Sequence, residues 1–444
     1  MAAIDASIVN IALPTLHATF HVGMLSVEWV AVAYLLTLAA LLPVIGRLSD
    51  QIGRSRLYTL GFGVFALGSG LCSLAPGLAT LVVFRVLQAL GAVALQANSI
   101  AIVSSLAHDR DTRAAAIGVQ GAAQALGLSV GPFAGGVLIH ALGWRSIFYL
   151  NVPIGIVGTA AAVAFLPREM LGKALEMDLR GSLLLSAALV AFSLFLTNAG
   201  SWPVVWLAIL AGFTVSCALL FRAHALRHED AVLDLRALAQ PRIWKGLLTG
   251  ALSYTVMYGA LFLLPFFLER VEGAMVDVAG RILMAVPVAM SLASATAGRM
   301  THLLSGRRLM SVGLGVMMAA CAGFALLLPG PGWAMLAVLA AVGLGMGLFT
   351  PANNASVMSA APGNLLGSIG GVLNMARTIG MMLGVSLGGL SLALAGSGVS
   401  QSTDWAVRQA SSYRLGFAVL AGTTAVALAL GMRNKGPAVS TAGP

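Results

Sequence analysis

Long runs of apolar residues recur along the whole chain and limit its fold more than any other feature. Each run is about 18 residues or longer with few charges, the length that an α-helix needs to cross a bilayer. Of the 444 residues, 59% are hydrophobic and 9% are charged, whereas soluble domains have about 25% charged residues. We therefore expect an all-α polytopic membrane protein. The 14 expected transmembrane helices lie at about 2–20, 28–45, 57–74, 78–106, 114–142, 146–166, 179–198, 204–221, 244–268, 276–297, 309–328, 334–360, 365–395 and 413–431.

The first expected helix differs from the others. It is barely long enough to span a bilayer, and the first cation of the chain is Arg47. A secretory signal peptide would carry a charged segment and a cleavage site, and both are missing. We expect a helix that is either short or truncated by a late start of the reading frame.

The net charge of +10 is interpreted as a topology signal. The cations lie between the apolar runs, mostly in the loops after every second helix and at the C-terminus. Since cytoplasmic loops are enriched in Lys and Arg, both termini are predicted to be cytoplasmic, in a bacterial cytoplasmic (inner) membrane. The lipid bilayer is thus a partner, and nucleic acid is not expected to be one. Three cysteines, each in a separate apolar run, suggest small core residues, and no metal site or cofactor is predicted.

One apolar run contains glycines four residues apart, a spacing that puts them on one face of a helix. Such a face lets a second helix approach closely, and a proline inside the run bends the helix. The pattern is formed by Gly127, Gly131, Pro132, Gly135 and Gly136. It returns 253 residues later at Gly380, Gly384, Gly388 and Gly389, where Val385 replaces the proline. The chain is therefore interpreted as a duplication.

The repeat distance is longer than six helices require, by about the length of two helices. The expected architecture is two six-helix repeats with two inserted helices, which is typical of a secondary transporter with its site near the bilayer midplane. The expected units are an N-terminal bundle (1–166), two inserted helices (167–221), a cytoplasmic linker (222–243), a C-terminal bundle (244–432) and a cytoplasmic tail (433–444).

The loop after the second expected helix combines glycines, which permit a tight turn, with an acid and arginines that can form a charged cluster. Its residues are Gly46, Arg47, Asp50, Gly53, Arg54 and Arg56. This loop resembles a signature of the major facilitator superfamily. The resemblance implies a conformational latch, although a simple positive-inside anchor is the alternative. The duplicate of the loop has His302 in place of the acid, which predicts a weaker or pH-sensitive latch.

Three further segments resemble one branch of that family, the 14-helix drug:proton antiporters. The Gly-Pro motif at Gly131 and Pro132 is similar to the motif of its exporting members. Residues 143–155 resemble a signature of the fifth and sixth helices, and residues 4–14 resemble a first-helix signature with Ser7 where Thr is usual. The resemblance covers nearly the whole chain and implies the major facilitator fold.

Asp5 and Arg85 are the candidates for proton coupling. Asp5 is the one acid that we expect well inside the bilayer, where an acid is functional by default. The resemblance ties its position to proton coupling and makes Arg85 its partner in proton transfer. The alternatives are a solvated acid near a helix end and an arginine that snorkels to the surface. Val338 stands near the place of Arg85 in the second repeat, so this chemistry is expected in one half only.

Polar residues within several apolar runs suggest a wet central cavity, although each could instead connect helices or pack. Arg377 is expected too deep to snorkel, and it either faces the cavity or ties neighbouring carbonyl groups together. The candidates are Asn10, Tyr34, Gln88, Asn98, Gln124, Tyr254, Tyr258, Asn353, Asn354 and Arg377.

The leading hypothesis is the export of small amphipathic organic compounds, drugs or metabolites, in exchange for protons by alternating access. A symporter or uniporter of a small metabolite is the alternative. An enzyme is not expected, since no nucleophile, metal cluster or phosphate loop is found, and no segment is long enough for a signalling domain. The expected partners are a small-molecule substrate and protons. A periplasmic adaptor with an outer-membrane channel is left open, and the protein is expected to act as a monomer. Neutral, zwitterionic or anionic substrates fit two arginines and one acid best.

Overall fold

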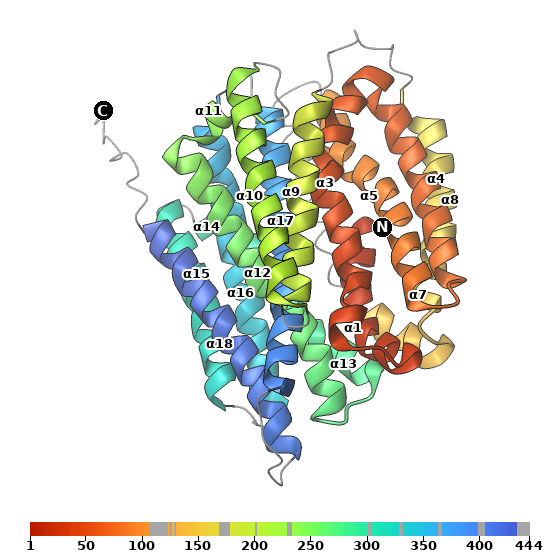
Figure 1. Cartoon of the computed structure of the whole chain (residues 1–444), viewed down its shortest axis with the longest axis vertical. Coiled ribbons are helices and arrows are strands. Elements are labelled where there is room, and N and C mark those ends of the chain that lie inside the picture. The colour runs from red at the N-terminus through yellow and green to blue at the C-terminus, as the bar shows by residue number, and fades with distance from the viewer. Residues whose placement is uncertain are drawn as a thin grey trace.

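The structure is a computed structural model that describes residues 1–106, 123, 127, 130–167, 178–199, 202–228, 233–300, 304–327, 332–362, 366–397 and 405–432. All regular elements in these ranges are helices, as the sequence predicts (Figure 1). The first half contains α1 (Ala2–Phe20), α2 (Met24–Val27), α3 (Trp29–Ile52), α4 (Arg54–Ser73), α5 (Leu78–Leu106), an unlabelled helix at Val130–Leu142, α7 (Ser146–Tyr149) and α8 (Asn151–Phe165).

In the sequence, two helices lie between the halves: α9 (Leu179–Asn198) and α10 (Val204–Arg227). The short α11 (Leu235–Leu238) follows them. The second half contains α12 (Pro241–Arg270), α13 (Val276–Leu283), α14 (Ala285–Met300), α15 (Gly306–Leu327), α16 (Gly332–Ala360), α17 (Leu366–Ser397) and α18 (Trp405–Met432).

Eleven helical segments of the described residues are long and apolar enough to cross a membrane. The three other expected spans correspond to α1, to α4 and, in its described part, to the helix Val130–Leu142. The chain is therefore a multi-pass integral membrane protein. Lipid offers no hydrogen-bond partners to the backbone, and a helix satisfies its own backbone polar groups within a single apolar segment.

The bundle has two ends, which we call the distal face and the proximal face and define by the helix ends and turns that they contain. The distal face holds the ends of α1 and α12 and the start of α3, and it lies at the bottom of Figure 1. The proximal face holds the α3–α4 turn and α11, at the top. Loop charges predict that the proximal face is cytoplasmic, and this orientation remains a prediction.

The glycine stripes pack as their spacing predicts, and they do so in both halves. A Cβ atom on Gly131 would overlap Ser7 of α1, and one on Gly135 would lie 2.6 Å from Ile8 Cγ1. In the second half, a Cβ atom on Gly384 would collide with the backbone of α12 at Thr255. Each stripe therefore holds the first helix of its own half at close range.

The loop expected after residue 45 is mostly helix. Since α3 continues to Ile52, Gly46 lies inside a helix, and the prediction that it permits a turn is wrong. Gly53 alone separates α3 from α4, and its φ of 102° and ψ of 126° suit a residue without a side chain. Likewise, α10 continues to Arg227, six residues beyond the expected end of its span.

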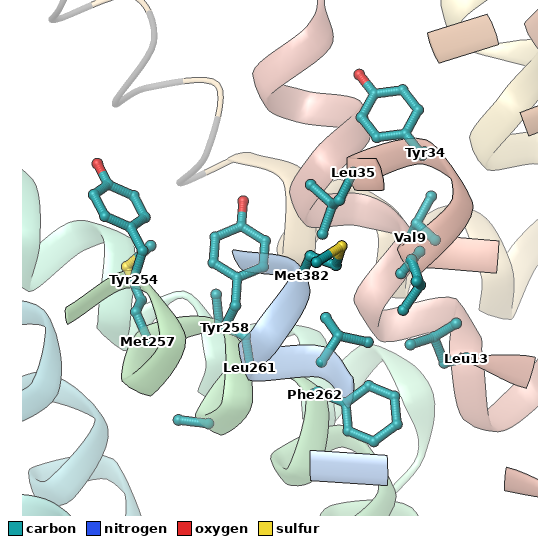
Figure 2. Close-up of a cluster of buried hydrophobic side chains, with 14 of the residues drawn as sticks. Val9, Leu13, Tyr34, Leu35, Tyr254, Met257, Tyr258, Leu261, Phe262 and Met382 are labelled. Carbon is teal, nitrogen blue, oxygen red and sulfur yellow. The ribbon is translucent and has the colours of Figure 1, made fainter. Parts of the chain in front are cut away.

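A continuous hydrophobic core joins the two halves (Figure 2). Val9 of α1 and Leu35 of α3 share it with Leu261 and Phe262 of α12 and Met382 of α17. The tyrosine hydroxyl groups of this cluster point to one side, away from Phe262.

The inserted helix α9 contacts both halves. The Ser186 hydroxyl group donates a hydrogen bond to the Ala40 carbonyl oxygen of α3 at 3.2 Å. The hydroxyl groups of Thr197 and Ser386 of α17 lie 3.3 Å apart. In Figure 1, α9 and α10 accordingly run along the front of the bundle, between α3 and α12.

Candidate functional site

An ion pair between Asp5 of α1 and Arg85 of α5 lies at the centre of the first half. Arg85 Nη1 donates to Asp5 Oδ2 at 2.7 Å, and the two side chains are 1% (Arg85) and 0% (Asp5) exposed. Arg85 therefore does not snorkel, and Asp5 is not solvated. The glycine stripe of the helix Val130–Leu142 lets α1, which carries Asp5, pack closely against that helix.

Three amide and hydroxyl side chains complete the surroundings of Asp5. Gln88 Nε2 donates to Asp5 Oδ1 at 2.8 Å, and Asn151 Nδ2 donates to the same oxygen at 3.1 Å. Gln88 also donates to Ser69 Oγ at 3.0 Å and accepts from Arg85 Nη1 at 2.6 Å. Asp5 thus accepts three hydrogen bonds, from α5 and α8, so both of its buried oxygens have partners within the protein.

The Arg85 guanidinium group has further partners besides Asp5. Its Nε atom donates to the Val30 carbonyl oxygen at 3.0 Å, and its Cζ atom lies 4.1 Å from the centroid of the Tyr34 ring. The Phe148 ring lies at 5.8 Å. These contacts hold the cation in place if Asp5 changes its charge, because hydrogen bonds to a carbonyl group and cation–π contacts do not depend on Asp5.

The second half has a different polar cluster, around Arg377 of α17. Arg377 donates to Asn354 of α16 and, at 3.2 Å, to Asn374. Its guanidinium group lies 5.7 Å from the Tyr254 ring of α12. The described residues give Arg377 neutral partners and no acid, unlike Arg85. Because α12 is the most enclosed of the spanning helices, Arg377 faces the protein interior.

The remaining cavity candidates separate into two groups. Asn98 donates to Ala94 of its own helix, and Asn353 donates to Gly246 and so connects α16 to α12. In contrast, Asn10 Nδ2 and the Tyr34 hydroxyl group are buried and without a partner among the described residues, and Tyr258 is 1% exposed. Gln124, His302 and the side chains of Arg47 and Asp50 lie outside the described residues, while Arg56 is exposed.

Sequence reasoning missed several residues of the site. Ser69 and Asn151 were not candidates, although Asn151 stands in one of the family-like segments. Glu28 was not a candidate either, although it is 0% exposed at the start of α3 and within an apolar segment. Its place directly before the apolar run suggested only the start of a helix.

These features define a class: a multi-pass α-helical membrane protein of two similarly packed halves, with a buried ion pair in one of them. The sequence matches the Major Facilitator Superfamily over residues 1–385. The chain belongs to this superfamily, whose members are transporters rather than enzymes.

Curated relatives agree with this assignment. The chain is 32% identical to the riboflavin transporter RibZ of Clostridioides difficile over 388 residues, which cover 87% of this chain and 84% of RibZ. It is 29% identical to the methylenomycin A resistance protein of Bacillus subtilis, with coverage of 89% and 85%. It is 30% identical to the multidrug resistance protein Stp of Mycobacterium tuberculosis, with coverage of 88% and 73%.

The fold has a counterpart among solved structures. A bacterial homologue of the human lysosomal transporter Spinster, in an inward-facing and unoccupied conformation, matches with a TM-score of 0.69 and 17% identity. The match covers 98% of this chain and 96% of that one. The protein is thus a transporter with the major facilitator fold.

Proposed function

We propose that this transporter exports small amphipathic organic compounds in exchange for protons, as a member of the 14-helix drug:proton antiporter branch. The observation that carries the proposal is the Asp5–Arg85 pair. Both of its side chains are buried, and within the described residues such a pair is found in one half only. An acid inside a membrane protein is costly and marks proton or ion pathways. Val338 is the counterpart of Arg85, so the described part of the second half has no equivalent pair at this place.

In this mechanism Asp5 takes a proton from the outer side and releases it to the cytoplasm. In the state described here, three hydrogen bonds reach its carboxylate group and Arg85 balances its charge. Protonation of Asp5 would leave the Arg85 charge buried without a counter-ion, which is unfavourable. The bundle then relieves this cost by rearranging, and this couples the proton to the motion of the two halves.

The substrate is proposed to bind between the halves, beside Arg377 and the tyrosines of α3 and α12. Arg377 has neutral partners, so it adds a net positive charge to this region. Anionic, zwitterionic or neutral amphiphiles fit that charge better than multiply charged cations. Resistance proteins and a riboflavin transporter among the relatives are consistent with small organic substrates.

A symporter or uniporter of a metabolite is the second candidate, favoured by the 32% identity to a riboflavin transporter. Inverted membrane vesicles with an imposed, inside-acidic pH gradient distinguish the two. Candidate compounds are added, and proton efflux is followed by the dequenching of an acridine dye. Antiport predicts dequenching in the wild type and none in Asp5→Asn at equal protein levels.

Two other results would redirect the proposal. Dequenching that survives in Asp5→Asn would keep the exporter and move the coupling site away from α1. Compound uptake into right-side-out vesicles, driven by inward proton flow, would replace export by symport. Asp277→Asn is the matched control, because Asp277 (25% exposed) and Arg281 (59% exposed) form a partly exposed pair instead of a fully buried one.

A further inference from the structure

Glu28, at the start of α3, is a buried acid that the coupling mechanism above does not use. Its side chain is 0% exposed, and neither carboxyl oxygen has a hydrogen-bond partner among the described residues. The Thr197 hydroxyl group at the end of α9 lies near the carboxyl group, but outside hydrogen-bond geometry. Glu28 is the N-cap residue of α3, but its side chain accepts no hydrogen bond from the first turn of the helix.

Within the described part of the chain, no charged group compensates this carboxyl group. The charged and titratable side chains described on α3 and on the helices that pack against it are Asp5, His17, Tyr34, Arg54, Arg56, Tyr58, Cys72, Arg85, Arg180 and Arg377. None of them donates a hydrogen bond to either carboxyl oxygen of Glu28. Asp5 and Arg85 are paired with each other, and Arg377 is held by two asparagines. Arg180 lies at the opposite end of α9 from Thr197. An ionised carboxylate without a counter-ion or donors is very unfavourable in such a place.

Glu28 lies at a contact between the two halves, at the distal face. Its carboxyl group rests on Gly389 of α17, where a Cβ atom would overlap Glu28 Oε2. Gly389 lies 253 residues after Gly136, which is likewise at a contact between the halves. A Cβ atom on Gly136 would lie 3.1 Å from Asp277 Cα of α13. Equivalent glycines of the two copies of the motif thus contact different groups: Gly136 packs against the backbone of α13, and Gly389 packs against the carboxyl group of Glu28.

We propose that Glu28 is a proton-operated switch of the distal face, neutral when α3 packs on α17 and ionised when the two helices separate. Opening releases the carboxylic acid proton to the water that enters, and closure takes one proton back. The switch rests on the proposed function, because this opening is the outer half of alternating access. The surrounding medium then sets the balance of states: acid favours the closed distal face, and alkaline medium favours the open one.

A distance measurement across the distal face tests this directly. Spin labels are attached to Leu74→Cys, an exposed position where α4 ends, and to Met275→Cys, an exposed position directly before α13. The three native cysteines are buried. In lipid nanodiscs, the wild-type background is expected to move from a short to a long distance as the medium changes from mildly acidic to mildly alkaline. Glu28→Gln is expected to keep the short distance throughout.

Gly389→Ala provides an independent test with the acid intact. The added methyl group would occupy the place of the carboxyl group, so the long distance is expected even in acid. Adding Glu28→Ala to Gly389→Ala vacates that place and is expected to restore the short distance. Glu272→Gln, which removes an exposed acid of the same face, is the control and is expected to follow the wild type.

The outcomes separate this switch from the antiport itself. A Glu28→Gln profile that follows the wild-type pH dependence would overturn the switch, whatever the vesicle assay shows. A lost pH dependence in Glu28→Gln, together with no compound-driven proton movement in the wild type, would keep the switch and refute antiport. If Glu28→Gln does not fold, Glu28→Ala takes its place, with the same expectation.

Discussion

Arg85 Nη1 donates to Asp5 Oδ2 at 2.7 Å and to Gln88 Oε1 at 2.6 Å. The Gln88 amide in turn donates to the other carboxylate oxygen of Asp5, at 2.8 Å. The three side chains form a closed ring of contacts. Each member is positioned by the other two, and a change in the charge of Asp5 is therefore felt at both Arg85 and Gln88.

Removing one charge of this pair should cost more than removing both. Asp5→Asn leaves Arg85 buried without a counter-ion, and we expect a loss of about 3–5 kcal/mol in stability. Adding Arg85→Gln should recover much of that loss without restoring proton coupling. Thermal unfolding in detergent and the vesicle assay measure the two effects. A double variant that is less stable than Asp5→Asn alone would contradict the pairing.

The close approach of α1 to the glycine stripe can be tested at Gly131. An alanine there would overlap the Ser7 hydroxyl group, and we expect Gly131→Ala to destabilise the protein by about 1–3 kcal/mol. Ser7→Ala should relieve part of this, because the nearest remaining atom, Ser7 Cβ, would lie at 3.0 Å. Gly63→Ala is the control, since nothing lies within 4 Å of its new Cβ atom. It should be neutral or stabilising by roughly 0.5–1 kcal/mol.

The two glycines of the α3–α4 motif should respond differently to the same change. Gly53 has a φ of 102°, so Gly53→Ala should cost roughly 1–3 kcal/mol through backbone strain and slow transport by disturbing the turn. Gly46 lies in a helix with nothing within 4 Å of an added Cβ atom, so Gly46→Ala should leave both stability and rate close to the wild type. Thermal unfolding and the transport rate measure both effects. Equal effects of the two substitutions would refute a special role of the turn.

Arg377 should affect anionic substrates more than neutral ones. Arg377→Gln removes the positive charge and is expected to raise KM for anionic compounds by about tenfold or more, about 1.4 kcal/mol of binding free energy per tenfold. Arg377→Lys keeps the charge but cannot bridge Asn354 and Asn374 in the same way, so an intermediate KM is expected. Transport of neutral compounds serves as the internal control. A uniform loss for all compounds would indicate a structural role of Arg377.

The sequence predicted the spans and the glycine contacts because both depend on local periodicity. A stripe at i, i+4 and i+8 lies on one helix face whatever the rest of the fold is, and Gly131 and Gly384 indeed receive the first helix of their own halves. The network around Asp5 could be predicted only in part. Ser69 and Asn151 reach it through the packing of α4 and α8, which no local pattern encodes.

Glu28 shows the limit most clearly. An acid that precedes an apolar run has the sequence appearance of a solvated helix start, and only the approach of α17 and α9 makes it buried. The extent of α3 was likewise not predictable, because the mostly polar segment Gly46–Ile52 continues the helix without a clear hydrophobic periodicity.

The position of α9 restricts where a lipid-dissolved molecule can enter the protein. Its Ser186 contacts α3 and its Thr197 contacts α17, so the boundary between the two halves on that side is covered by polypeptide. Compounds that partition into the bilayer therefore meet α9 and α10 on this side (Figure 1). At the other contact between the halves, where Gly136 lies against α13, no inserted helix is found among the described residues.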